Sequence, residues 1–286
     1  MSEMSAPIPL AVHQPEIVRI EPAQGWSTLN LKELWQHREL LLMFAWRDLK
    51  GSYAQTWLGA SWIVIKPLVL MAIFTVVFGL FVRVPSGGIP YSIFVFAGLI
   101  PWQFFARSFF GVGASLATNQ HLISKVYFPR LLLPLSALVA PALEVVIMTF
   151  VLAVMMWYYH ISPSGTLWVV PMLVIFAAVT AFGAGLWVSA LSVRFRDISH
   201  AHQFITQVWF FSTPIVYPDE LVPEGWLWLY RMNPMTEVVA GIRSVLLGVG
   251  HISVTTALYP ALLAALLLVS GLYLFQCVDR EYVDTV

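Results

Sequence analysis

The chain has 286 residues, of which 59% are hydrophobic and only 10% are charged, and its mean hydropathy is +0.79. Soluble proteins carry about 25% charged residues, so lipid must be the solvent for much of this protein's surface. Fifteen basic residues balance fifteen acidic ones, which argues against a nucleic-acid partner, and the single cysteine, Cys277, excludes an intrachain disulfide and a thiolate metal cluster.

The N-terminal region precedes any long apolar run. Residues 1–28 are polar and proline-rich, without the basic start and apolar core of a cleavable signal peptide. Residues 31–50 show helical periodicity, with apolar side chains on one face, charged ones opposite, and Arg38 misplaced at the centre of the apolar face. A helix with this many charges cannot span hydrocarbon, so we expect it to lie in the headgroup plane. The alternative is a soluble helix packed on a partner. We therefore divide the chain into a cytoplasmic tail (1–30), an amphipathic interface helix (31–53) and a transmembrane domain (54–286).

Six later stretches are long and apolar enough for a spanning helix, which needs about 20 apolar residues. The fifth is the shortest. The pattern predicts an all-α integral membrane protein with six transmembrane helices, near residues 57–82, 91–117, 132–159, 167–192, 200–217 and 255–276.

The connection between the fifth and sixth predicted spans contains a short helix. Asn233 is a good N-cap, Pro234 suits the first helical position, and Glu237 lies near the positive end of the helix dipole. Glycines follow Leu247 and end the helix. Carrying Glu237 and Arg243, it is too short and too charged to cross, so we expect an interfacial or re-entrant helix.

The positive-inside rule predicts the orientation of these spans. With six spans both termini share a side, and most basic residues of the connections fall there, which predicts cytoplasmic termini. That side carries Arg19, Lys32, Arg38, Arg47, Lys50, Lys125, Arg130, Arg194, Arg196 and Arg280, and the opposite side Arg83, Arg231 and Arg243.

Three ionisable residues fall within predicted spans: Lys66, Arg107 and Glu144. Charge inside a bilayer is unfavourable, so each is a candidate for a functional role. The alternatives are structural. Lys66 is close enough to the cytoplasmic end to extend to the headgroups, and Arg107 and Glu144 could pair with each other or line a wet cavity.

Aromatic side chains cluster on the first, second and fifth predicted spans. Their faces can stack on the apolar faces of sugar rings without demanding a charge, which suits a path for a long glycan. The alternatives are lipid-facing belts and helix packing. The candidates for a glycan channel are Trp62, Phe74, Trp102, Phe105, Trp209, Phe210 and Phe211.

The connection at 118–131, TNQHLISKVYFPRL, mixes polar and aromatic residues, and Pro129 ends a short helical stretch. A helix that docks into a partner's groove uses such a pattern, whereas a plain loop does not need it. The residues that would contact a partner are His121, Ser124, Lys125, Tyr127 and Arg130.

Catalytic and metal-binding patterns are missing from the sequence. It contains no G-x-x-x-x-G-K-[ST] phosphate-binding loop, so we do not expect this chain to hydrolyse ATP. His200 and His202 would fall on roughly opposite sides of a helix, a poor arrangement for a metal. We therefore predict a protein that is not an enzyme, with no catalytic residue, no metal site and no cofactor of its own.

Several segments together resemble the permease subunit of polysaccharide ATP-binding-cassette exporters, with the O-antigen branch as the most similar. The resemblance covers roughly residues 45–250, in order and with consistent spacing. It is carried by RDLKGSYAQTWLGASW (47–62), GLIPWQFFARSF (98–109), LISKVYFPRLLLPL (122–135), VRFRDISH (193–200), VWFFSTPIVYP (208–218) and NPMTEVVAGIRSVLLG (233–248).

This resemblance implies partners and roles that the spacing alone does not. It implies a homodimer in the bacterial inner membrane that binds two nucleotide-binding ATPase subunits, which hold ATP and Mg, and that exports undecaprenyl-linked polysaccharide of the O-antigen, capsule or teichoic-acid type to the periplasm. Residues 118–131 would be the coupling helix and 31–50 the gating interface helix. The aromatic residues would line the glycan channel, and the helices between spans five and six, with Asn233, Pro234, Glu237 and Arg243, would form the periplasmic gate.

Three other functions remain open at this stage. One is an exporter of small hydrophobic drugs or lipids with the same fold. Another is an intramembrane glycosyl- or acyltransferase, which would need clustered acid–base residues where this sequence has scattered charges. The third is a proton-coupled carrier, which would work without an ATPase.

Overall fold

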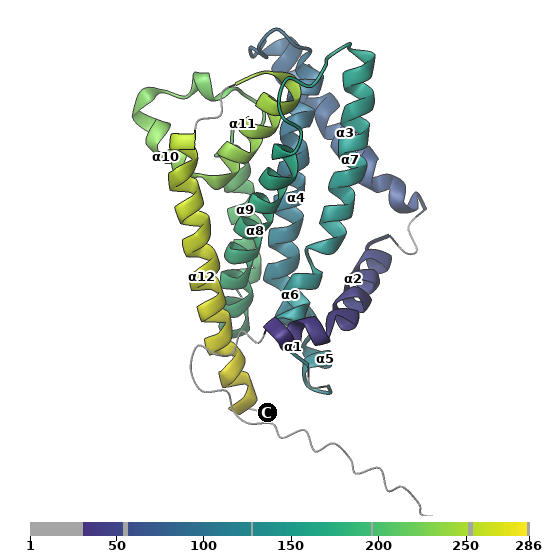
Figure 1. Ribbon diagram of the computed structural model, residues 1–286, viewed down its shortest axis with the longest axis vertical. Helices are drawn as coiled ribbons and strands as arrows, with labels where there is room; N and C mark the ends of the chain where they lie inside the picture. Colours follow the sequence, from purple (N-terminus) through teal and green to yellow (C-terminus); the bar gives the residue numbers. More distant parts are fainter. Residues whose placement is uncertain (1–30, 54–56, 127, 196, 251–253, 285–286) are drawn as a thin grey trace, which may run out of the picture.

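The computed structural model describes residues 31–53, 57–126, 128–195, 197–250 and 254–284. The regular elements among these residues are all helices, which form one elongated bundle (Figure 1). This confirms the predicted all-α membrane fold.

Five helical stretches in the described residues are long and apolar enough to cross a membrane. Their membrane-crossing portions, 59–81, 91–118, 132–158, 169–194 and 257–278, agree with the predicted first, second, third, fourth and sixth spans to within two residues. They are α3 (Trp62–Phe74) continued by the π-helical η3 (Thr75–Phe81), α4 (Tyr91–Thr118), α6 (Leu132–Ser136) with α7 (Val139–Tyr158), α8 (Val169–Arg194), and α12 (Val254–Asp284).

The predicted fifth span, 200–217, is not one continuous helix. In its place α9 (Ile198–Phe211) has 14 residues and is about 21 Å long at 1.5 Å per residue, against about 30 Å of hydrocarbon. A non-helical segment, 212–218, follows it. The helix does not continue through this segment because Pro214 and Pro218 have no backbone N–H to donate. The count of six spans therefore stays a prediction.

Four short elements follow this segment before the last long helix: η4 (Asp219–Leu221), η5 (Glu224–Trp226), α10 (Leu227–Met232) and α11 (Pro234–Leu247). The predicted bounds of α11 are confirmed. Asn233 caps it by accepting a hydrogen bond from the Met235 amide at 3.0 Å, and Gly248 ends it with a φ of 71°, where a side chain would be strained. α11 packs on α4, α8 and α12.

The N-terminal amphipathic region forms two helices, α1 (Leu31–Gln36) and α2 (Arg38–Tyr53), rather than one. They lie with α5 (Gln120–Ile123) at the end of the bundle where α12 finishes, opposite α10 and α11 (Figure 1). Leu41 and Phe44 pack on a small core around Phe128, while Trp35 and Trp46 stay exposed. The exposed tryptophans fit a position in the headgroup layer.

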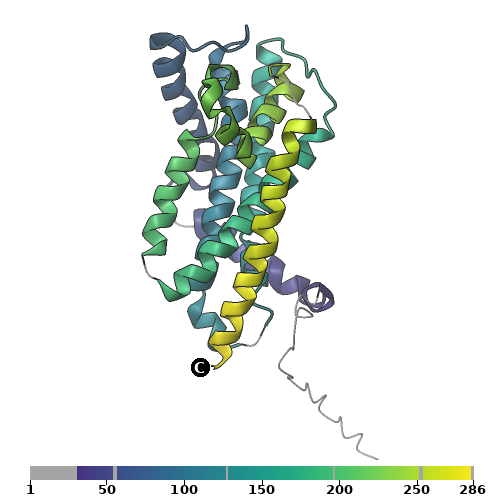
Figure 2. The same ribbon diagram turned by 90° about the vertical axis from the view of Figure 1, so that its left-hand side faces the viewer.

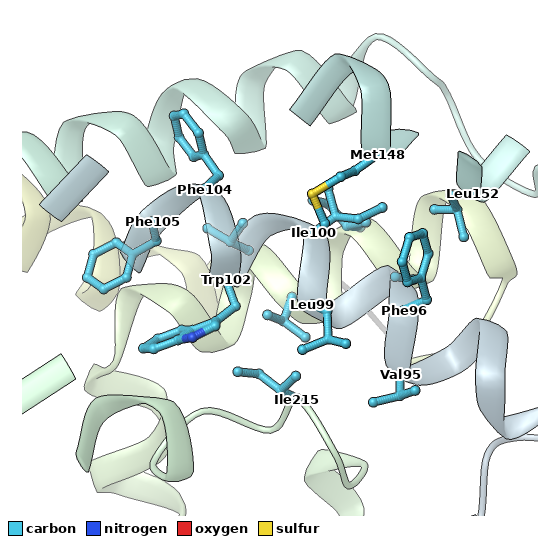
Figure 3. Packing of buried hydrophobic residues seen from close by; sticks show 14 of the residues in the cluster. Val95, Phe96, Leu99, Ile100, Trp102, Phe104, Phe105, Met148, Leu152 and Ile215 are labelled. Carbon is cyan, nitrogen blue, oxygen red and sulfur yellow. The ribbon is translucent and has the colours of Figure 1, made fainter. Parts of the chain in front are cut away.

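Helix α4 is the centre of the bundle. In its most apolar stretch 78% of the residues are buried, against 11% for the span of α3. Figure 3 shows side chains leaving α4 in opposite directions: Ile100 faces Met148 of α7, whereas Leu99 and Trp102 face Ile215. A Cβ on Gly185 of α8 would lie 2.6 Å from Val112, so glycine is what lets α8 approach α4 closely.

Candidate functional site

A groove of about 1060 Å³ is lined by residues of α3, α4, α6 and α7 on the bundle side, by α9, and by Arg47, Asp48 and Ser52 of α2. One face of α4 forms its floor, because the lining residues recur every three to four positions, as the helical repeat requires. These α4 residues are Trp102, Gln103, Ala106, Arg107, Phe110, Gly111, Ala114, Ser115 and Thr118.

The opposite wall is α9, which stands along one edge of the bundle (green in Figure 2). Its lining residues are Gln203, Thr206, Gln207, Phe210 and Phe211. The α9 wall thus combines neutral amides and a hydroxyl with aromatic rings, and the charged lining residues Arg47, Asp48 and Arg107 belong to α2 and α4. Amides can exchange hydrogen bonds with hydroxyl groups, and rings can cover apolar C–H faces, so these walls suit a neutral polyhydroxylated chain.

Three consecutive aromatic residues near the end of α9 have different surroundings. Trp209 points inward, with its ring 4.6 Å from that of Phe105 and its Nε1 donating to Asn233 Oδ1 at 2.8 Å. Phe210 lines the groove and contacts Trp102, and Phe211 lines it while 60% exposed. Phe210 and Phe211 are thus available to a substrate, whereas Trp209 is used for packing.

The other aromatic candidates divide in the same way. Phe74 lines the groove, stacked on Phe210 with ring centroids 5.9 Å apart, and Trp102 lines it with only 5% of its surface exposed. Phe105 is fully buried behind the floor. Trp62 is not among the lining residues, and its ring lies 5.6 Å from Lys66 Nζ. Their roles in transport stay predictions.

Arg107 and Glu144 form an ion pair at the edge of the groove. Arg107 Nη1 lies 2.6 Å from the Glu144 carboxylate, and the side chains are 40% and 8% exposed respectively. Tyr53, at the end of α2, donates its hydroxyl to Glu144 and accepts from Arg107 at 3.1 Å. Burial and the Glu144 carboxylate raise the pKa of Tyr53, so its hydroxyl keeps its proton. The cluster ties the interface helix to α4 and α7, a link that the sequence did not indicate.

The connection at 118–131 lies at the same end as α1 and α2 (Figure 1). α5 is only four residues long, and His121, Ser124 and Lys125 are exposed. Arg130 is half-buried, and Tyr127 lies outside the described residues. Phe128 anchors the connection by packing against Phe44 with ring centroids 5.4 Å apart.

The gate candidates at the other end are not freely exposed. Asn233 accepts from Trp209 and donates to Ser212 O and Thr213 Oγ1. Pro234 is buried at the first position of α11, and Glu237 is half-buried. Arg243 is only 4% exposed, so it is not a loop charge of the kind that the positive-inside rule counts.

The sequence analysis missed the polar lining of the groove. Gln103, Gln203, Thr206 and Gln207 are ordinary residues taken singly. Their helical spacing within apolar stretches was the signal that could have identified them. His202 lies buried with its ring 4.2 Å from that of Phe109, while His200 is exposed.

The fold and groove define a multi-pass helical membrane protein with an amphipathic path along its central helix. More specifically, the chain belongs to the ABC-2 type transporter family, whose profile matches residues 39–247. Members of this family are transport subunits that work with ATPase subunits.

Curated relatives of this chain are named as permease proteins of O-antigen export systems. Two O-antigen export system permease proteins RfbA from Klebsiella pneumoniae are 31% and 30% identical to it. The alignments cover 72% and 86% of this chain, and 80% and 94% of the relatives. A protein of the same name from Myxococcus xanthus is 27% identical over 75% of this chain and 83% of its own length.

Proposed function

We propose that this chain is the permease subunit of an ATP-driven exporter that moves lipid-linked polysaccharide of the O-antigen type from the cytoplasm to the periplasm. The lipid carrier would be undecaprenyl, and the membrane the bacterial inner membrane. The observation that carries the proposal is the groove, whose lining combines amide and hydroxyl groups with the rings of Phe110, Phe210 and Phe211. The names of the relatives support this substrate class.

The groove chemistry suits a moving polymer. Single contacts of a sugar ring with an aromatic face or a neutral amide are weak, so a chain can exchange them one by one as it advances. A row of fully desolvated charges would hold a polymer too tightly. Arg107, the charged residue on the floor, is already neutralised by Glu144.

A second copy of the chain would complete the path. On α9, Phe204, Ile205, Val208 and Phe211 are exposed and recur at helical spacing, which gives α9 an apolar outer face at the edge of the bundle (Figure 2). Two such faces related by a two-fold axis would enclose the grooves between them. This supports the homodimer, and disulfide cross-linking of a Val208→Cys variant in a Cys277→Ser background tests it.

Two ATPase subunits would bind at the end that carries α1, α2 and α5, where His121, Ser124 and Lys125 are exposed. This end would face the cytoplasm, together with both termini. In a Cys277→Ser background, an impermeant thiol reagent should label a Gly225→Cys variant in intact cells and a Ser124→Cys variant only after lysis. Labelling of both from outside would contradict the orientation.

The substrate is tested by deleting the gene and complementing it. We expect the deletion strain to lose surface polysaccharide and to accumulate lipid-linked polymer inside, and the wild-type gene to reverse both effects. Extracted polymer is measured by immunoblotting against the glycan. Unchanged surface polysaccharide, with increased retention of hydrophobic dyes, would instead support the alternative, an exporter of small hydrophobic drugs or lipids.

A further inference from the structure

The break after α9 puts non-helical backbone inside the bundle. Thr213, Pro214, Ile215 and Val216 are all buried. Backbone carbonyls at such a depth have no water to bond, and an unpaired one is strongly unfavourable. The segment 212–216 must therefore find its hydrogen-bond donors within the protein.

Each carbonyl of this segment has an identified donor. Asn233 Nδ2 donates to Ser212 O at 3.2 Å, and the Ile215 amide donates to Thr213 O at 2.7 Å. Arg243 donates to Pro214 O at 2.7 Å through Nη1 and to Ile215 O through Nη2. The Tyr91 hydroxyl donates to Val216 O at 2.5 Å. The donors come from α4, from α11 with its cap residue Asn233, and from the segment itself, so the break is fully hydrogen-bonded within the fold.

Arg243 contributes most to this set. Its guanidinium also donates to Phe94 O at 3.2 Å through Nε, and its central carbon lies 3.7 Å from the centroid of the Phe94 ring. Three donors in one plane thus connect α11, the break and α4. A lysine ammonium carries its three donors on one nitrogen and cannot reproduce this planar fork.

The α4 backbone leaves room for this side chain. A Cβ on Gly98 would lie 2.6 Å from Arg243 Nη2 and 3.3 Å from Ile215 O. Glycine is unfavourable inside a helix relative to alanine, so its place here is explained by the guanidinium that it admits. Gly98 and Arg243 therefore act as a matched pair.

We propose that Arg243 is the positioning residue that holds the break after α9 and thereby sets the position of Phe210 and Phe211 at the wall of the groove. The connection is short, since the break begins at Ser212, directly after Phe211. Phe210 and Phe211 can present a constant surface to a substrate only if this end of α9 stays in place. The consequence for export rests on the proposed function, whereas the local structural role does not.

Cysteine labelling tests the local role in the full-length protein. In a Cys277→Ser background, a Val216→Cys reporter reacts with a hydrophilic thiol reagent in broken-cell membranes, where both faces are accessible. Val216 is 5% exposed and loses no side-chain hydrogen bond on substitution, so its labelling should be slow. Adding Arg243→Met should speed it by on the order of tenfold or more, because the segment loses two buried partners. Arg243→Lys should lie between.

A second buried reporter separates local from general effects. Ser136→Cys, fully buried in α6, should stay unlabelled in the Arg243→Met background. Equal acceleration at both reporters would reduce Arg243 to a general stabilising residue and overturn the proposal. So would unchanged labelling of the Val216→Cys reporter.

Gly98→Ala provides an independent variant if Arg243→Met does not accumulate. It keeps the charge but displaces the guanidinium, so it should also accelerate labelling of the Val216→Cys reporter. Slow labelling in the Gly98→Ala protein would contradict the proposal. In cells, both variants should lower surface polysaccharide at unchanged protein level. The two parts of the proposal can fail separately. If the Val216→Cys reporter is labelled faster but deletion of the gene leaves surface polysaccharide unchanged, the proposed function fails and the positioning role of Arg243 stands.

Discussion

Among the described residues, Arg107 and Arg243 both lie in the helix bundle, and they are stabilised in opposite ways. Arg107, on the floor of the groove, is 40% exposed and pairs with the carboxylate of Glu144. Arg243, near the other end, is 4% exposed and donates to backbone carbonyls of Phe94, Pro214 and Ile215. Their contact points on α4, Phe94 and Arg107 itself, are 13 residues apart, or about 20 Å.

The difference shows what each arginine is suited to do. An ion pair between two side chains can open and close as the helices that carry it move, and Tyr53 brings the interface helix into the same cluster. Carbonyls cannot move away without unfolding the segment that carries them. The ion pair at the Arg107 end can therefore rearrange without unfolding of backbone, whereas the carbonyl contacts at the Arg243 end hold the break after α9 against α4 and α11.

The largest effect should come from removing the buried arginine. Arg243→Met orphans the carbonyls of Pro214 and Ile215, which at about 1–3 kcal/mol each destabilises the protein by about 2–6 kcal/mol. Thermal unfolding of the detergent-purified protein checks this, with the exposed Arg83→Met as the matched control. A melting temperature equal to that of the control would contradict the assigned contacts.

Substitutions of Trp209 and Phe211 at the aromatic end of α9 should have different effects, the first on stability and the second on export. Trp209→Ala should destabilise by about 2–4 kcal/mol, because it opens a cavity beside Phe105 and removes the bond to Asn233. Phe211→Ala should leave the melting temperature nearly unchanged but lower surface polysaccharide several-fold.

Phe150→Ala is the control for this pair, since Phe150 of α7 is 70% exposed and does not line the groove. Quantitative immunoblots of glycan and of membrane protein report the two effects separately. Normal export by the Phe211→Ala protein would place the substrate path elsewhere.

The effects of substituting Arg107 and Glu144 on stability should depend on each other, unlike the effect of substituting Arg243. Arg107→Met leaves a buried carboxylate without its counter-charge and should destabilise by about 1–2 kcal/mol, a modest value because Arg107 is partly exposed. Adding Glu144→Leu should restore most of the loss, since no buried charge then remains. A double variant less stable than Arg107→Met would show that the pair contributes net stability of its own.

The smallest effect should come from Tyr53→Phe. It removes one hydroxyl between α2 and the pair and should change stability by about 0.5–1.5 kcal/mol. If this contact transmits motion of α2, ATPase activity of the assembled transporter should respond less to substrate in the variant. Equal stimulation in both proteins would leave the contact a purely structural one.

Long apolar runs made the spanning helices predictable. α4 and α12 were found because a helix must satisfy its own backbone in lipid, so about 20 apolar residues suffice as a signal. The start of α11 at Asn233 was predictable for the same reason, because the preferences of Asn, Pro and Glu for the start of a helix depend only on the first turn. The break after Phe211 was missed, since apolar residues continue through Ile215 and Val216 and hydropathy does not register unpaired carbonyls.

The sequence by itself determined the all-α membrane class, the bounds of five spanning helices and the helix from Pro234 to Leu247. Those features depend on neighbours along the chain. Only the tertiary structure decided that Glu144 meets Arg107 and Tyr53, and that Arg243 meets the carbonyls of the break. These partners lie 28 to 91 residues apart in the chain, and no local pattern selects them from the other polar groups. The groove itself is likewise a product of packing, because its walls come from helices that meet only when the bundle is complete.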